Sequence, residues 1–218
     1  MDTLFGLADP VSCLTHAMVA VLLIVQAVWL VRRVGDSPRR QLAMVLYLVC
    51  CVAMLFSSAT YHGLPHEHAL KSTFWHLDHA LIWISLAATY TTVQALFLPV
   101  DGARFRARLL WALALTGVIL ELSVLESLPL WVSPLLYVGM GWACFPILLA
   151  VFRRHGAYPA GLMFAGGVIV SIGGVIDSTS LPNLYPGVFE AHELLHLTTV
   201  VAFYAHWWPI SQGADGRF

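Results

Sequence analysis

Charged residues are scarce in this sequence. Asp, Glu, Lys and Arg make up 11% of its 218 residues, whereas hydrophobic residues make up 59%. A soluble domain carries about 25% charged residues, and a chain this apolar would aggregate in water. The composition therefore excludes a soluble enzyme or binding domain and indicates an integral membrane protein. The net charge of −1 identifies no partner by its size, and nucleic acid is not an expected partner.

Cysteine is also rare, and repeats and low-complexity segments are lacking. Cys13, Cys50, Cys51 and Cys144 all lie in apolar stretches, which favours small buried side chains over a disulfide framework. No basic segment precedes the first apolar run, which is of spanning length. We therefore expect a retained helix there rather than a cleaved signal peptide. The alternating strands of about ten residues that build membrane barrels are missing as well.

Apolar runs of membrane-spanning length are abundant. A hydrocarbon core of about 30 Å requires roughly 20 apolar residues in a helix, and backbone groups in lipid must be satisfied within the segment. The connections are short and rich in turn residues, so neighbouring helices must be near-antiparallel. We predict an all-α bundle of seven transmembrane helices, with residues 1–218 forming a single integral membrane domain. The predicted spans are Val11–Val31, Gln41–His62, Trp75–Phe97, Leu109–Leu125, Pro134–Phe152, Ala160–Asp177 and Ala191–Ile210.

Basic residues are concentrated on one side of this topology. The first, third and fifth connections carry nine arginines, whereas the second, fourth and sixth carry only Lys71. Short connections rich in Lys and Arg face the cytoplasm, so we expect the N-terminus outside and the C-terminus inside. A compact chain of this kind favours a bacterial inner membrane. The arginines are Arg32, Arg33, Arg39, Arg40, Arg104, Arg106, Arg108, Arg153 and Arg154.

Histidines and acidic residues gather on the opposite side. Eight of the ten histidines fall there, namely His16, His62, His66, His68, His76, His79, His192 and His196. The acidic residues on that side are Asp78, Glu121, Glu126, Asp177, Glu190 and Glu193. Ionisable groups in membrane spans are costly and normally face the bundle interior, so a functional site is the default interpretation.

Two spacings within this group favour a metal site. His192 and His196 are one helical turn apart and project from one face, and Ser58 and His62 share that spacing. A helical pair of histidines with a third from another helix supplies three zinc ligands and leaves a fourth position open. Asp78 and Ser58 are placed to hydrogen bond there. A lone membrane histidine is more often a packing residue, but this combination favours metal.

His206 lies about 15 Å deeper than His196, at 1.5 Å per residue, and is not expected to share the site. The segment 192–196 (HELLH) also matches H-E-x-x-H, the zinc protease pattern in which Glu is the general base. An intramembrane protease of this kind adds a distant Asp ligand within Leu-Asp-Gly, and the sequence has no such tripeptide. Asp177 could substitute, although its neighbours lend no support. A protease therefore stays an alternative.

Three segments together resemble the hemolysin III / progestin and adipoQ receptor (PAQR) family. Ser58–His62 (SATYH) resembles its S-x-x-x-H motif, and His192–His196 is similar to its H-x-x-x-H seventh helix. Leu77–Ile82 (LDHALI), followed by Ala88–Thr91 (ATYT), resembles its third helix. The segments occur in the family's order and the resemblance covers most of the chain. It departs at Ala88 and Thr92, where the family has Gly and Pro.

The resemblance implies a Zn²⁺ ion held by His62, His192 and His196, with Asp78 and Ser58 around the open position. It also implies kinship with alkaline ceramidases, which are seven-helix zinc amidases acting on lipids. We therefore expect zinc-dependent hydrolysis of a lipid amide or ester, with membrane lipids, including a ceramide-like lipid, as partners. A receptor or stress protein with structural zinc is the alternative. A pore is disfavoured because no polar stripe crosses the full depth of the bilayer.

Overall fold

The computed structural model describes residues 6–124, 127–129, 131–185 and 188–218. Within these ranges the chain is helical and forms no strand beyond one isolated bridge between Tyr185 and Phe189. The helices are α1 (Pro10–Arg33), α2 (Pro38–Gly63), α3 (Lys71–Phe97), α4 (Ala103–Ser123), α5 (Val132–Ala143), α6 (Phe145–His155), α7 (Ala157–Thr179) and α8 (Ala191–Ala214). α5 and α6 follow one another around Cys144 and form one span of 24 residues. The prediction of an all-α bundle with seven spans is confirmed.

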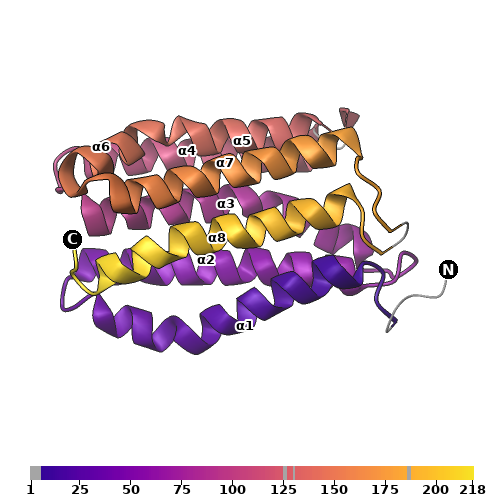
Figure 1. The fold of residues 1–218 in the computed structure, drawn as a ribbon, viewed down its shortest axis with the longest axis horizontal. Helices are drawn as coiled ribbons and strands as arrows, with labels where there is room; N and C mark the ends of the chain where they lie inside the picture. The colour runs from indigo at the N-terminus through magenta and orange to yellow at the C-terminus, as the bar shows by residue number, and fades with distance from the viewer. Residues whose placement is uncertain (1–5, 125–126, 130, 186–187) are drawn as a thin grey trace.

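Five of the spans in the described part of the chain are long and apolar enough to cross a membrane on length and hydropathy alone. They are α1, α2, α3, the α5–α6 pair and α7. α4, which carries arginines and Glu121, and α8, which carries three histidines, are not in this group. Both nevertheless lie alongside the other spans in one bundle of near-antiparallel helices (Figure 1). The chain is therefore a multi-pass membrane protein.

Local chemistry sets the ends of the helices. Proline occupies the first turn of α1 and α2, where its missing N–H costs no hydrogen bond. Gly102 and Gly156 adopt positive φ angles of 69° and 82° at the starts of α4 and α7, a conformation that glycine adopts without strain. These turns lie where the sequence predicts them.

Some predicted boundaries differ from the structure. α3 begins at Lys71 rather than Trp75, so Asp78 lies two turns inside the helix and not at its mouth. The predicted fifth span is interrupted at Cys144. The N–H of Cys144 donates to the carbonyl oxygen of Gly141, three residues earlier, which makes a tighter turn than an α-helix. Leu125, the predicted end of the fourth span, lies outside the described residues.

The two ends of the bundle differ in chemistry. We call the end that holds His62 and His196 the histidine end, and the end that holds Arg33 and Arg104 the arginine end. The described N-terminal segment lies at the histidine end and the C-terminus at the arginine end (Figure 1). At the arginine end, Arg33 contacts both carboxylate oxygens of Asp215 at 2.5 and 2.6 Å, which joins the end of α1 to the end of α8.

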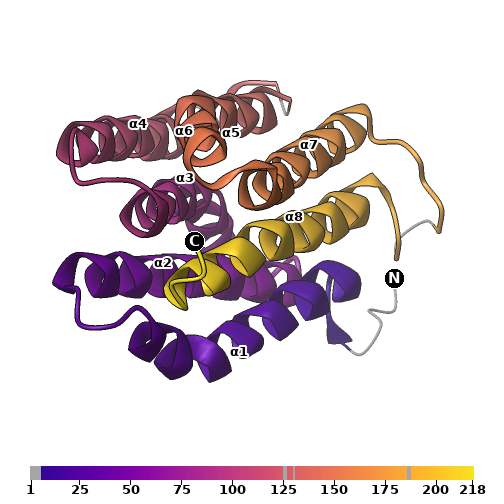
Figure 2. The same cartoon turned by 60° about the vertical axis from the view of Figure 1, so that its left-hand side comes forward.

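Helix α8 occupies a central position between α1 and α7 (Figure 2). Glycines of α7 allow its close approach. A Cβ atom at Gly166 would lie 2.8 Å from His206 Nδ1 and 3.0 Å from the carbonyl oxygen of Ala202, both on α8. A Cβ atom at the adjacent Gly167 would meet no atom within 4 Å. Because Gly166 has no side chain, α7 and α8 can approach each other closely at this point.

We expect Gly166→Ala to lower the thermal stability of the purified protein in detergent, because the added methyl must push α8 aside. Overpacking of this kind costs about 1–3 kcal/mol. Gly167→Ala is the matched control, and we expect it to leave stability unchanged or to raise it by up to about 1 kcal/mol through helix propensity. Equal melting temperatures for the two variants would contradict this description of the α7–α8 contact.

Candidate metal centre

Three histidines from two helices meet at the histidine end. His62 lies in the last turn of α2, and His192 and His196 lie in the first two turns of α8. One nitrogen of each ring lies within 4.8 Å of the other two. The Nε2 atoms of His192 and His196 are 3.1 Å apart. His62 and His196 are buried, whereas the side chain of His192 is 45% exposed and forms the open side of this histidine triad.

The other nitrogen of each ring is held by a residue from elsewhere in the chain. Nδ1 of His62 lies 2.9 Å from Asp9 Oδ2, and Nδ1 of His192 lies 3.0 Å from Asp177 Oδ1. A carboxylate only accepts hydrogen bonds, so both histidines carry their proton on Nδ1 and present a lone pair at Nε2. Such partners orient metal-binding imidazoles and increase their basicity.

This arrangement fits a metal ion. Nitrogen lone pairs that converge repel one another unless a cation lies among them. Two nitrogens bound to zinc at 2.0–2.1 Å in tetrahedral geometry are roughly 3.3 Å apart, close to the 3.1 Å between His192 and His196. Imidazole ligands suit zinc, copper, iron and nickel. The triad of His62, His192 and His196 can therefore hold a metal ion.

Asp9 connects α1 to the triad through two hydrogen bonds. Its backbone N–H donates to the carbonyl oxygen of His62 at 2.9 Å, and its carboxylate accepts from the ring of the same residue. Burial alone would raise the pKa of the Asp9 carboxyl, but the hydrogen bond and charge of His62, with a smaller effect of Lys71, hold this pKa below its usual value. The ionised form that orients His62 is thus favoured.

His16 has a role that the sequence did not indicate. Its Nε2 lies 3.1 Å from His196 Nδ1, so the third ring of the triad is also held through its outer nitrogen. Position in the sequence placed His16 on the correct side of the membrane, but a single residue on a predicted helix does not reveal which helix it faces. Its contact depends on α1 packing against α8 in the folded bundle.

The Glu193 side chain caps the N-terminal end of α8. One carboxylate oxygen accepts the N–H of Glu190 at 2.9 Å, within a capping box at the first turn. The other accepts the hydroxyl of Ser12 on α1 at 3.2 Å. Both oxygens are therefore engaged in positioning α8, which disfavours the role of a general base that the H-E-x-x-H pattern suggests.

Ser58 and Asp78 lie next to the triad. Asp78 Oδ2 is 3.9 Å from His62 Nε2, and Ser58 lies close enough to the Asp78 carboxylate to influence it. Both side chains are buried, with 1% and 8% of their residues' surface exposed. The structure thus brings all five predicted site residues together.

The remaining polar residues of the histidine end lie apart from the triad. Glu121 accepts a hydrogen bond from Tyr137 at 2.7 Å, and Nδ1 of His79 bonds to the carbonyl of Trp75. His206 is absent from the triad, as expected from its depth. Glu126, counted with this group in the sequence, lies outside the described residues.

Two cavities adjoin the triad. The larger, of about 560 Å³, runs from His62, His192 and His196 into the bundle between α2, α3, α7 and α8. Its walls are mostly apolar and extend to His206 and Tyr90. The smaller, of about 340 Å³, lies on the outer side of the triad beside Asp9 and Glu190. The triad therefore separates an apolar interior from a polar pocket.

Membrane-spanning helices around a histidine triad define an integral membrane protein with a candidate metal centre. Its sequence matches the family described as haemolysin-III related over residues 7–207, and the chain belongs to that family. It is 24% identical to Hemolysin-3 of Bacillus cereus over 175 residues, which cover 79% of each chain. It is 25% identical to a Hemolysin-3 homolog of Bacillus subtilis (strain 168) over 166 residues, which cover 74% of this chain and 76% of the relative.

We expect Asp177→Asn to weaken metal binding by about 10- to 100-fold, because His192 loses the carboxylate that orients its ring. Affinity is to be measured by titration against a chelator of known affinity. Asp101→Asn, an exposed change at the arginine end, is the control. Equal affinities for the two variants would show that Asp177 does not support the site.

Proposed function

We propose that this protein is a zinc-dependent hydrolase of a membrane lipid that contains an amide or ester bond. One observation carries the proposal: the triad has only three histidines, and it lines the apolar cavity together with Asp78 and Ser58. Structural zinc sites are closed by four protein ligands, whereas catalytic sites keep one position open. Three ligands beside a cavity therefore support catalysis over a purely structural ion.

The residues have distinct roles in this proposal. His62, His192 and His196 hold the ion through Nε2. Zinc bound there supplies a Lewis acid that polarises a carbonyl group and lowers the pKa of water. Asp78 accepts the proton of the attacking water at Oδ2 and returns it to the leaving nitrogen or oxygen. The Ser58 hydroxyl, buried beside the same carboxylate, orients it toward the open position.

The cavity supports a lipid with an acyl chain as the proposed substrate class. Its volume of about 560 Å³ lies in the range of ligand pockets, and apolar side chains dominate its walls. An acyl chain fits such a space, with its carbonyl at the triad. A membrane lipid, such as a ceramide-like amide, is therefore the proposed substrate. The pocket beside Asp9 and Glu190 lies opposite and suits the entry of water.

A protease is less well supported than a lipid hydrolase. The engagement of both Glu193 oxygens leaves the H-E-x-x-H pattern without its general base. Asp177, the substitute ligand for such an enzyme, instead bonds to the outer nitrogen of His192.

The metal and the reaction can be tested on protein purified in detergent. We expect about one zinc per chain in the wild type and almost none in His192→Ala/His196→Ala. Asp78→Asn should keep the metal yet lose hydrolysis of a ceramide or fatty-acyl ester by about 10²- to 10⁴-fold, because it lacks the proton acceptor. Asp101→Asn is the control. A metal-free wild type, or full turnover by Asp78→Asn, would contradict the proposed mechanism.

We infer from the arginine bias that the histidine end faces outward and the arginine end faces the cytoplasm. Asp36 and Glu67 lie in exposed connections at the arginine and histidine ends. A membrane-impermeant maleimide should label Glu67→Cys in intact cells and Asp36→Cys only after permeabilisation. The unsubstituted protein, with its four free cysteines, gives the background. The reverse labelling pattern would invert the orientation.

A further inference from the structure

The apolar cavity has a second polar zone far from the triad. One face of α8 lines the cavity continuously, through His192, His196, Thr199, Phe203 and His206. His206 is ten residues beyond His196, about 15 Å along the helix. Tyr90 of α3 and Tyr47 of α2 also line the cavity. The ring centroids of Tyr90 and His206 are 6.3 Å apart.

Tyr47 places a hydroxyl in this zone without a partner. The residue is fully buried, and its hydroxyl has no hydrogen bond to any residue that the structure describes. Its ring stacks on Phe203, one turn from His206, with centroids 6.2 Å apart. Burying a hydroxyl without a partner is unfavourable, and phenylalanine would pack in the same place. The hydroxyl is therefore expected to meet a polar atom that enters the cavity.

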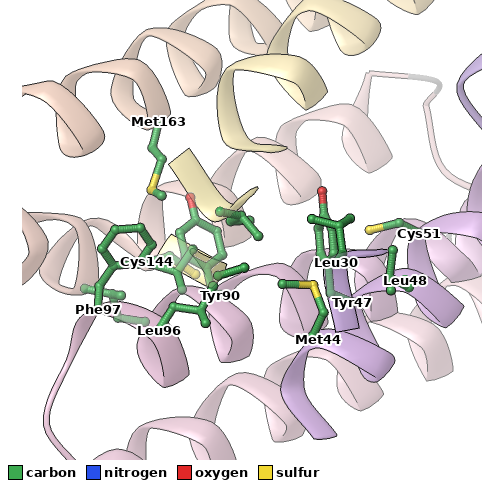
Figure 3. Packing of buried hydrophobic residues seen from close by; sticks show 14 of the residues in the cluster. Leu30, Met44, Tyr47, Leu48, Cys51, Tyr90, Leu96, Phe97, Cys144 and Met163 are labelled. Carbon is green, nitrogen blue, oxygen red and sulfur yellow. The ribbon is translucent and has the colours of Figure 1, made fainter. Parts of the chain in front are cut away.

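His206 supplies the complementary group. Its Nδ1 donates to the carbonyl oxygen of Ala202 at 2.8 Å, so the neutral ring presents an acceptor lone pair at Nε2. Tyr90 adds a second phenol to the cavity wall beside His206. Figure 3 shows the Tyr47 and Tyr90 hydroxyls pointing to the same side, away from Met44 and Leu96. One end of the cavity thus offers phenol donors beside an imidazole acceptor.

We propose that this zone binds a hydroxyl group carried by the acyl chain of the lipid. A hydroxyl can accept from Tyr47 and donate to His206 Nε2, whereas a ketone can only accept. The inference rests on the proposed function in one respect, because the triad holds the carboxyl end of the chain. An extended chain advances by roughly 1.25 Å per carbon–carbon bond, so about 15 Å places the hydroxyl near carbon 12.

The test measures binding rather than turnover. Purified wild-type protein is titrated with 12-hydroxyoctadecanoate, 12-oxooctadecanoate, 2-hydroxyoctadecanoate and octadecanoate in the same detergent. We expect the 12-hydroxy acid to bind more tightly than octadecanoate by about three- to tenfold, the effect of one buried hydrogen bond. The 12-oxo acid should bind with intermediate affinity, and the 2-hydroxy acid should show no gain. Equal binding of all four acids would overturn the proposal.

Variants assign the preference to the two side chains. Tyr47→Phe should reduce the preference for both the 12-hydroxy and the 12-oxo acid over octadecanoate. His206→Phe should reduce the preference for the 12-hydroxy acid alone. Tyr204→Phe, on the exposed face of α8, is the matched control. A preference that survives both cavity variants would show that ordered water, and not the ligand, satisfies these groups.

Binding and hydrolysis measured on the same protein distinguish failure of this inference from failure of the proposed hydrolase. If wild-type protein binds the 12-hydroxy acid selectively but hydrolyses no lipid amide or ester, the polar zone is supported and the reaction is wrong. If it hydrolyses such lipids without any preference for a hydroxyl near carbon 12, the reaction stands and the polar zone is wrong.

Discussion

The outer nitrogens of the histidine triad impose the constraint on which the rest of the structure depends. Each of the three rings is fixed by a group from another part of the chain: Asp9 for His62, Asp177 for His192 and His16 for His196. These hydrogen bonds connect α1, α2, α7 and α8 at one end of the bundle. Because the carboxylates hold protons on Nδ1, the inner lone pairs converge and favour a cation. The contacts that join these four helices at this end are therefore the same contacts that orient the triad.

Much of this could be predicted from the sequence because membrane burial allows few solutions. Apolar run length gave the spans, and antiparallel connection of the spans brought His62, Asp78 and the His192–His196 pair to one end. Helical spacing placed both histidines of α8 on one face. The family resemblance, confirmed by the match over residues 7–207, agreed with that geometry.

The partners of the triad could not be predicted in the same way. His16 and Asp177 lie on the correct side in the sequence, but their contacts depend on the rotation of α1 and α7 about their axes, which a run of apolar residues does not define. Glu193 matched a catalytic pattern, yet its oxygens cap α8 and bond to Ser12. The Cys144 break also escaped prediction, because apolar residues continue on both sides of it.

The residues proposed to bind the metal and the residues that shape the deeper cavity lie on different turns of the same helices. The triad lies in the first turns of α8, and the cavity wall continues for about three further turns to His206. A substitution in the deeper wall can change which chain fits without moving a metal ligand. Under the proposed function, a relative that shares a quarter of its residues with this chain can accept a different lipid chain and still keep the same triad. The turns of α8 that hold the triad and the turns that shape the deeper cavity can therefore change independently of one another.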